Sequence, residues 1–412
     1  MKSSLLFLAT SSLLFSACGT TQGPPGAGGH PLQQEALATA YTVRLPGHSP
    51  EEQAILLTQT VYPATREDNA VGAIILCPQD PQLAYMAMHR VTHMPVNAPL
   101  LYLDKNDRLS EQTLREMKRL QPEGVLGDHR TDVYGLNVPA TEVKRVEELL
   151  GYKVRNFQAP DPVSMAELLD RWAGALKADH PDEVVLSAVD HPASIAHGVG
   201  PMGWNAHMGK GFAWVYHDSI PHATRRMLER RYGEAYLYVV GDTTMVSDRV
   251  VRELAQYGIA RRLIGPTPQA TSALNAGYKD YGRNYAWWWD WDGRAFGWGI
   301  AQSGHNYIIG TPDDLLFIIP AAVLGHMGKH GPILLVERDS VPSSVRDYLT
   351  MVKPSPTGSQ ETVLNYAWII GDTSRLTAHV QQTVDRLLSP FPMPVDTTLY
   401  VSDTDPLGEK AP

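Results

Sequence analysis

The chain of 412 residues is 43% hydrophobic and 19% charged, a balance that supports globular cores along its length. Its formal net charge is −9 and it contains no basic block. This composition excludes a disordered chain and argues against nucleic acid, or any polyanion held by bulk charge alone, as a partner.

The N-terminus predicts a lipoprotein signal peptide over residues 1–18. Lys2 precedes an apolar stretch, Leu5 to Phe15, that is too short to span a bilayer comfortably. Ser16-Ala17-Cys18 then resembles a bacterial lipobox, in which the cysteine accepts the lipid. An ordinary signal peptide cleaved nearby is the alternative. Gly19 replaces the Asp that retains sorted lipoproteins at the inner membrane, so we expect a membrane-anchored lipoprotein of the cell envelope, at the outer membrane or cell surface.

A flexible tether is expected next, over residues 19–37, because residues 19–31 are rich in Gly and Pro and lack apolar periodicity. Cys77 is the only other cysteine besides Cys18, so a lipidated chain has no intramolecular disulfide. Cys77 lies in an apolar run and is expected to be a buried small hydrophobic residue.

The remaining chain predicts three modules, residues 38–151, 152–259 and 260–392, followed by a tail, 393–412. Each module opens with a short strand that contains Arg, at residues 41–44, 152–155 and 260–264. A helix follows, at residues 50–61, 162–176 and 268–281. Second strands are expected at residues 73–77, 183–188 and 306–311, and third strands at 99–103, 212–216 and 332–336. This alternation predicts an α/β fold of three Rossmann-like (flavodoxin-like) modules with parallel sheets.

The fourth strand is the most distinctive repeat. The apolar run Tyr236 to Val240 ends at Gly241-Asp242, and a helix with a hydrophobic stripe follows. The same order returns at Ala367, with the turn Gly371-Asp372. A weaker copy is expected from Gly124, where the turn is Gly127-Asp128 and the helix begins late, near Glu142.

These repeats resemble the cell wall-binding repeat 2 family, which occurs in threes on surface proteins of Gram-positive bacteria. The matching residues are Arg262-Leu-Ile-Gly265, Asp314-Leu-Leu316, Gly331-Pro-Ile-Leu-Leu335 and Val239 to Ser247. The resemblance covers about residues 41 to 390. It implies a pseudo-threefold arrangement of Rossmann-like modules that binds an envelope polysaccharide non-covalently.

The Gly-Asp turns are the first candidate ligand site, because open α/β sheets bind ligands at the carboxyl ends of their strands. Hydroxyl and carboxylate groups there suit sugar hydroxyls. The alternative is that the Asp residues only cap turns and helices. The candidate residues are Asp242, Thr243, Thr244, Asp372, Thr373 and Asp128.

A second repeated signature is a His-Met pair just before each third strand. The pairs begin at His93, His207 and His326. His and Met together suit copper or another late transition metal, and pseudo-threefold packing would bring the three pairs together. The alternative is a histidine that interacts with a helix C-terminus beside a core-filling methionine.

The third module carries an insertion, residues 278–306, that holds five of the nine tryptophans. Exposed indole faces stack on sugar rings, and Trp288 and Trp291 are the leading candidates because Asp290 and Asp292 beside them accept hydrogen bonds from hydroxyls. The alternative is a plug between modules.

No catalytic motif supports an enzyme, and no cofactor is expected. Gly198 to Gly203 matches the dinucleotide pattern by letter, but it lies nine residues beyond its strand and contains Pro201. We therefore expect an envelope lipoprotein that binds or organises polysaccharide. The alternatives are a structural protein that docks on another envelope protein and a periplasmic metal-binding protein.

Overall fold

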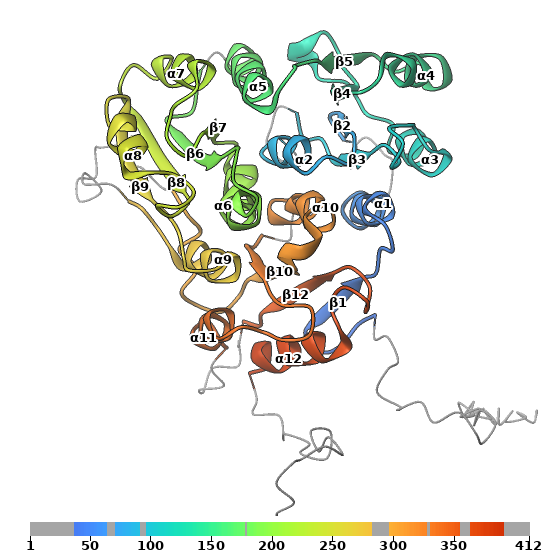
Figure 1. The fold of residues 1–412 in the computed structure, drawn as a ribbon. Coiled ribbons are helices and arrows are strands. Elements are labelled where there is room, and N and C mark those ends of the chain that lie inside the picture. Colours follow the sequence, from blue (N-terminus) through green and yellow to red (C-terminus); the bar gives the residue numbers. More distant parts are fainter. Residues whose placement is uncertain are drawn as a thin grey trace, which may run out of the picture. The chain divides into compact units, whose positions relative to one another are not determined.

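The computed structural model describes residues 37–63, 71–90, 96–177, 179–281, 296–327, 330–354 and 363–390. All of these residues belong to one compact unit, Glu35–Pro412. They form three parallel four-stranded sheets that alternate with helices (Figure 1), which confirms the predicted α/β fold of Rossmann-like modules.

The first two sheets are each formed by four consecutive strands, whereas the third combines β1 with the last three strands. The first sheet has the order β3 (Leu100–Tyr102), β2 (Ile74–Cys77), β4 (Val133–Leu136), β5 (Val154–Phe157). The second has the order β7 (Gly211–Val215), β6 (Glu183–Ala188), β8 (Ala235–Val240), β9 (Gly258–Arg262). The third has the order β11 (Ile333–Leu335), β10 (Asn306–Gly310), β12 (Tyr366–Ile370), β1 (Thr42–Leu45).

The strand that opens each sequence module pairs outside that module. β5 pairs with β4, β9 pairs with β8, and β1, near the start of the described chain, pairs with β12 near its end. The last pairing runs in parallel from Thr42 opposite Ala367 to Leu45 opposite Ile370. The modules are therefore interlocked by exchanged strands, while the module boundaries along the sequence stay a prediction.

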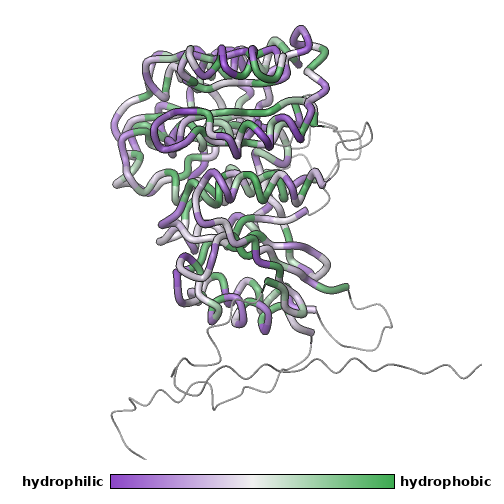
Figure 2. Tube along the Cα trace, turned by 90° about the vertical axis from the view of Figure 1, so that its right-hand side faces the viewer, coloured by the Kyte–Doolittle hydropathy of each residue, from purple (hydrophilic) through white to green (hydrophobic). Residues whose placement is uncertain are grey.

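The helices begin where the sequence supplies N-terminal caps. Ser49 and Asp80, for example, each accept a hydrogen bond from a backbone amide in the first turn of the helix that follows, and proline occupies the next position. Figure 2 shows hydrophilic and hydrophobic residues alternating along the helical turns, as expected for helices that bury one face. The α-helices are α1 (Pro50–Val61), α2 (Pro81–Met88), α3 (Glu111–Leu120), α4 (Ala140–Leu150), α5 (Pro162–Lys177), α6 (Ser194–Met208), α7 (His222–Glu229), α8 (Asp248–Leu254), α9 (Pro268–Gly277), α10 (Leu315–Ile318), α11 (Ser343–Met351) and α12 (Ala378–Leu388). Short 3-10 helices are η3 (Leu126–Asp128), η4 (Pro312–Asp314) and η5 (Ile319–Gly325).

The helix after each exchanged strand crosses to the next sheet. α1 follows β1 of the third sheet and contacts β3 of the first, while α5 follows β5 of the first and contacts β7 of the second. α9 follows β9 of the second sheet and contacts β11 of the third. In addition, α2, α6 and η5, which follow equivalent strands, contact one another pairwise, as a pseudo-threefold arrangement requires. Buried residues from all three sheets belong to one contiguous core.

The fourth strand of the first sheet lies later than its predicted position. Gly127 and Asp128 belong to η3, which precedes β4. The turn after β4 is Asn137-Val138-Pro139. The apolar run before Gly127 is short, and Val125 forms only an isolated bridge with Thr131. The prediction that Gly127-Asp128 forms the turn after the fourth strand is therefore wrong, because these residues lie before β4.

The glycine run that matches a dinucleotide pattern lies inside α6 and serves helix packing. A Cβ atom at Gly198 would lie 1.8 Å from Oη of Tyr85 in α2, and one at Gly200 would lie 3.0 Å from Cα of Ser272 in α9. These glycines therefore allow helices of three modules to approach closely.

The pairing of β1 with β12 is reinforced by buried polar contacts. Arg44 of β1 is only 2% exposed, and its guanidinium donates to Gln381 Oε1 (2.9 Å), to the Gly371 carbonyl (2.9 Å) and to the Thr377 carbonyl (3.4 Å). Asp385 of α12 accepts from the Tyr41 amide at 2.7 Å. The N-terminal strand is thus held by side chains as well as by the sheet.

We predict that Arg44→Ala destabilises the protein by about 2–4 kcal/mol, because buried acceptors of β12 and α12 lose a charged donor. Denaturant unfolding of the full chain measures this change. Val43→Thr is the matched control, since Val43 lies on the same strand, is 40% exposed and stays β-branched. Equal unfolding midpoints for the two variants would contradict a structural role for Arg44.

Candidate functional site

The Gly-Asp turn of the second sheet is built around the carboxylate of Asp242. Its Oδ1 accepts from the Thr244 hydroxyl (2.6 Å), the Thr244 amide (2.8 Å) and the Met245 amide (3.2 Å). The hydrogen bonds from Thr244 hold the pKa of Asp242 below its ordinary value. Asp242, Thr243 and Thr244 are all exposed. The carboxylate therefore organises the turn and stays ionised at the surface.

The turn of the third sheet has the same construction. Asp372 Oδ1 accepts from the hydroxyl (2.6 Å) and the amide (3.0 Å) of Ser374, and Oδ2 lies 2.7 Å from Nδ1 of His48. Partial burial alone would raise the pKa of Asp372, but the hydrogen bonds from Ser374 and His48 keep it below its ordinary value. Thr373 is half-buried here.

An arginine from the neighbouring edge strand holds each of these two turns. Arg262 of β9 donates to the carbonyls of Gly241 (2.7 Å) and Val246 (2.7 Å), as Arg44 of β1 donates to those of Gly371 and Thr377. These carbonyls lie where the strand passes into the helix, and the guanidinium groups supply donors to them there. In these two cases, the Arg of an edge strand thus stabilises the turn that follows the neighbouring strand.

Further polar side chains gather at the carboxyl end of the second sheet. The amide of His217 donates to both oxygens of Asp190 (3.2 Å), and its Nε2 lies 3.2 Å from the Thr243 carbonyl. His217 Nδ1 is 2.9 Å from Asp218, and the contacts with Thr243 and Asp218 raise the pKa of His217. Tyr216, directly before it, is 41% exposed. We call these residues with the turn the carboxyl-edge cluster: Asp190, Tyr216, His217, Asp218, Asp242 and Thr243.

The sequence prediction included the turn of this cluster but missed Tyr216 and His217. Both follow directly after the apolar run of β7. Their position directly after a strand could have identified them. Parallel strands end at the same edge of a sheet, and β7 and β8 both flank β6. The residues after β7 therefore lie at the edge where Gly241-Asp242 lies.

Asp128 does not belong to a carboxyl edge. It precedes β4, is 5% exposed, forms an ion pair with Arg155 and accepts from Trp172 Nε1 at 3.0 Å. Amides hold the equivalent turn of the first sheet instead: Asn137 Oδ1 accepts from the Ala159 amide at 3.0 Å. Asp128 thus links the first sheet to α5, and the first sheet differs chemically from the other two at its carboxyl edge.

Two of the three predicted metal ligands lie together. Nδ1 of His207 and Nδ1 of His326 are 3.0 Å apart, and the ring of His330 lies 4.6 Å from that of His207, centroid to centroid. His93 lies outside the described residues. Within the described part of the chain, no group of three or more His, Cys, Asp or Glu side chains is placed to hold a metal ion. Metal binding by His93, His207 and His326 stays a prediction.

The described ends of the tryptophan insertion pack against the second module. Phe296 stacks on Tyr238 of β8, with ring centroids 3.7 Å apart, and Trp298, 7% exposed, stacks on His207 of α6 at 4.9 Å. This part of the insertion fits the plug interpretation. Four predicted sugar-binding residues lie outside the described residues: Trp288, Asp290, Trp291 and Asp292.

The membrane-related predictions rest on the sequence. Cys18 lies outside the described residues. None of the helices that the structure describes is long and apolar enough to cross a membrane. Cys77, by contrast, is described and is fully buried in β2, as expected, and burial raises the pKa of its thiol.

Two solved structures share this fold. No protein-family model and no curated protein matches the chain. It is similar to Cwp6 from Clostridium difficile, with a TM-score of 0.64 and 15% identity over 86% of this chain and 49% of that chain. Cwp8 from Clostridium difficile has a TM-score of 0.61 and 15% identity over 86% of this chain and 52% of that chain. The chain spans about half the length of each, and the likeness shows a common fold.

We predict that acidification weakens the contact around His207. Burial lowers the pKa of His305 and His330, as do the neighbouring histidines and, for His330, Lys279. A histidine whose folded pKa is depressed binds fewer protons than in the unfolded chain. Its contribution to stability is therefore present above the unfolded pKa of about 6.5 and is lost as the pH falls through the folded pKa.

Melting temperatures measured from about pH 7 to about pH 5 test this prediction. The slope should become shallower in the double variant His305→Asn, His330→Asn. Part of the slope should remain, because burial also lowers the pKa of His89 and His197. A variant slope equal to that of the wild type would show that this contact carries none of the acid sensitivity.

Proposed function

We propose that the protein binds an envelope polysaccharide non-covalently, and that the carboxyl-edge cluster of the second sheet contributes the binding surface. Its fold is shared with Cwp6 and Cwp8 from Clostridium difficile, and its repeats resemble the cell wall-binding repeat 2 family. The observation that carries the proposal is that Tyr216, 41% exposed, directly precedes His217, which contacts Asp190, Asp218 and Thr243 at this edge.

These groups suit a neutral, hydroxyl-rich ligand. A tyrosine face stacks on a sugar ring, and ionised carboxylates accept hydrogen bonds from hydroxyls. The carboxylates would repel a phosphate or sulfate group. The Asp residues are also engaged in turn hydrogen bonds, so the cluster is expected to bind without catalysis.

We predict that Tyr216→Ala weakens binding to purified envelope polysaccharide by roughly 2- to 10-fold, as expected for one lost aromatic contact of roughly 0.5–1.5 kcal/mol. Affinity is measured by titration of the immobilised full-length protein, and the melting temperature should change little. Tyr232→Ala is the matched control, because Tyr232 is 91% exposed and lies just before β8, at the amino end of the same sheet. Equal losses in both variants, or no loss in either, would reject this surface.

We further propose that the chain is anchored to a membrane through lipidated Cys18, which would hold the polysaccharide-binding modules at the envelope. This proposal rests on the apolar run and the small residues before the cysteine. Cys18→Ser should move the protein from the membrane fraction to the soluble fraction, since acyl chains contribute roughly 0.8 kcal/mol for each buried CH₂ group. Membrane fractionation of the variant identical to that of the wild type would argue against the anchor.

A further inference from the structure

His217 is placed so that both nitrogens of its imidazole ring face hydrogen-bond acceptors. Its Nε2 lies 3.2 Å from the carbonyl oxygen of Thr243, and its Nδ1 lies 2.9 Å from Oδ2 of Asp218. Hydrogen bonds from Ser247 and His217 hold the pKa of Asp218 below its ordinary value, so this ionised carboxylate, like the carbonyl, can only accept. A neutral imidazole has one N–H group and satisfies one of the two acceptors, whereas the imidazolium ion satisfies both.

The protonated ring joins two segments at the carboxyl end of the second sheet. Asp218 belongs to the segment after β7, and Thr243 belongs to the turn after β8. The backbone of His217 makes further contacts, since its amide donates to both carboxylate oxygens of Asp190 at 3.2 Å and its carbonyl accepts from the Ser247 amide at 2.8 Å. These backbone contacts persist in both charge states, so only the links from the ring depend on its protonation.

The charged groups around the ring favour its protonated state. The hydrogen bonds with Thr243 and Asp218, together with the negative charge of Asp190, raise the pKa of His217 above its ordinary value of about 6.5. Arg249 of α8 helps to keep Asp218 ionised. The ring therefore changes charge close to neutral pH, while the carboxylate beside it stays charged.

Two further histidines lie near this edge, and both keep their contacts when neutral. Nδ1 of His191 accepts from the Ala193 amide at 3.3 Å, a contact that uses a nitrogen without a proton. Nδ1 of His197 lies 2.8 Å from the hydroxyl of Thr271, which can donate or accept. Burial lowers the pKa of His197, although Asp242 on the neighbouring turn opposes the shift. Neither ring therefore depends on a second proton for its contact.

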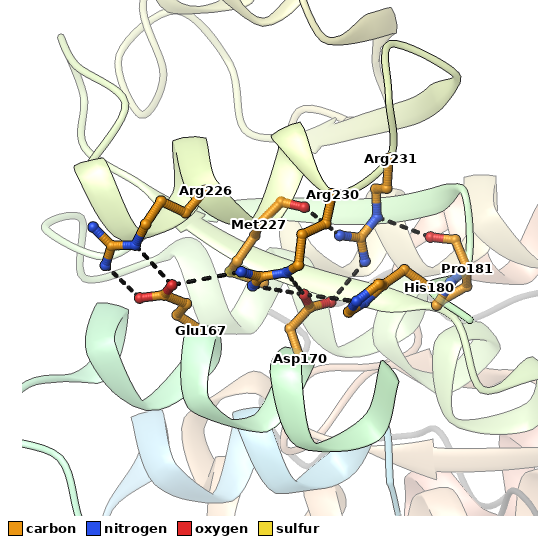
Figure 3. Close-up of polar contacts among 8 residues, drawn as sticks. All are labelled: Glu167, Asp170, His180, Pro181, Arg226, Met227, Arg230 and Arg231. Carbon is orange, nitrogen blue, oxygen red and sulfur yellow. Dashed lines mark hydrogen bonds and ion pairs between the residues drawn. The ribbon is translucent and has the colours of Figure 1, made fainter. Parts of the chain in front are cut away.

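His180 lies beside a carboxylate as well, but in a network that stays paired without it. Its Nδ1 is 3.4 Å from Asp170, which also forms ion pairs with Arg231 at 2.7 Å and with Arg230 at 3.0 Å (Figure 3). Arginine remains protonated throughout the physiological pH range, so Asp170 keeps its partners when His180 is neutral. Loss of a proton thus breaks a link at His217 and leaves this network paired.

The equivalent position of the third module carries a permanent cation. The sequence His-Asp-Ser at residues 217–219, after β7, matches Arg-Asp-Ser at residues 338–340, after β11. In both modules the carbonyl of the first of these residues accepts from the amide of the residue that caps the next helix, at 2.8 Å for His217 and 2.9 Å for Arg338. The third module therefore has a fixed positive charge where the second has one that titrates.

We propose that His217 is a proton-dependent positioning residue of the carboxyl-edge cluster, whose protonated ring fixes the segment that carries Tyr216 against the turn that carries Thr243 and so strengthens polysaccharide binding. The effect rests on the proposed function of this cluster. When the ring loses its proton, it keeps one acceptor and presents a lone pair to the other, so ordering the surface costs more of the binding free energy. Binding should therefore be tightest below about pH 6.5 and should weaken as the pH rises through the raised pKa of His217.

The pH dependence of binding by the immobilised full-length protein tests the proposal, with purified envelope polysaccharide as the probe. Wild-type affinity should fall roughly 2- to 5-fold from about pH 6 to about pH 8, as expected for the loss of one exposed charged contact. His217→Gln has no charge to lose, so its affinity should be weak and nearly equal at both pH values. His217→Arg, which copies Arg338 of the third module, should remove the fall at about pH 8 because its charge is permanent.

His222→Gln is the matched control, since His222 is exposed at the start of α7 and lies outside the cluster. It should keep the pH dependence of the wild type. No binding by the wild type at either pH would reject the polysaccharide-binding function and the role of His217 with it. Wild-type binding that does not change with pH, or a pH dependence that persists in His217→Gln, would reject the role of His217 alone.

Nuclear magnetic resonance of the imidazole ring checks the geometry without a ligand. In the wild type, both ring nitrogens of His217 should carry protons at about pH 6, and the titration midpoint should lie above the ordinary value of about 6.5. The midpoint should fall in Asp218→Asn, because the ring loses its anionic acceptor. A wild-type midpoint at or below the ordinary value would overturn the proposal.

Discussion

The pairing of β1 with β12 is the interaction on which the arrangement of this protein depends. A strand of four residues near the start of the described chain completes a sheet whose other strands lie more than two hundred and fifty residues later. Because the strands β5 and β9 are exchanged in the same way, every sheet is completed by a segment that continues into the helix covering the next sheet. No sheet is therefore built from its own sequence module alone, and loosening one exchanged strand also loosens a helix on the neighbouring sheet.

The same exchange brings side chains of the edge strands to the Gly-Asp turns. Arg262 and Arg44 arrive on exchanged strands and bind the carbonyls of turns that belong to the preceding module. The Asp side chains of these turns accept hydrogen bonds from backbone amides of the same turns. A residue such as Thr243, with only its carbonyl engaged by His217, sits on a turn fixed from both sides. Rigid presentation of a few exposed polar groups would favour the proposed glycan binding, because ordering a mobile loop on binding costs conformational entropy.

The sequence predicted the local structure well and the long-range pairing poorly, for physical reasons. α1 was predicted with its observed bounds because a capping serine and a proline define its start, and β6 because a buried parallel strand is a continuous apolar run. The convergence of His207 and His326 followed from their equivalent positions in the repeats. The exchange of β1, β5 and β9 carries no local signal, since the partner of a strand is set by the whole topology. Gly127-Asp128 shows that a dipeptide motif alone does not locate a turn, because the residues before it do not form a strand. Tyr216 could be found only once β7 and β8 were known to lie in one sheet.

The second module contacts its neighbours mainly through uncharged groups, and its buried ion pairs lie within the module itself. Toward the third module, α6 presents glycines and aromatic rings, and Trp204 packs on Trp298. Toward the first module, Tyr85 of α2 packs on aromatic rings of β7. Asp170 of α5, by contrast, pairs with Arg231, which follows α7 in the same module. An apolar contact tolerates small shifts, whereas a buried ion network is favourable only in the arrangement that pairs its charges. The ion pairs should therefore fix α5 against the end of α7 more strictly than the apolar contacts fix one module against the next.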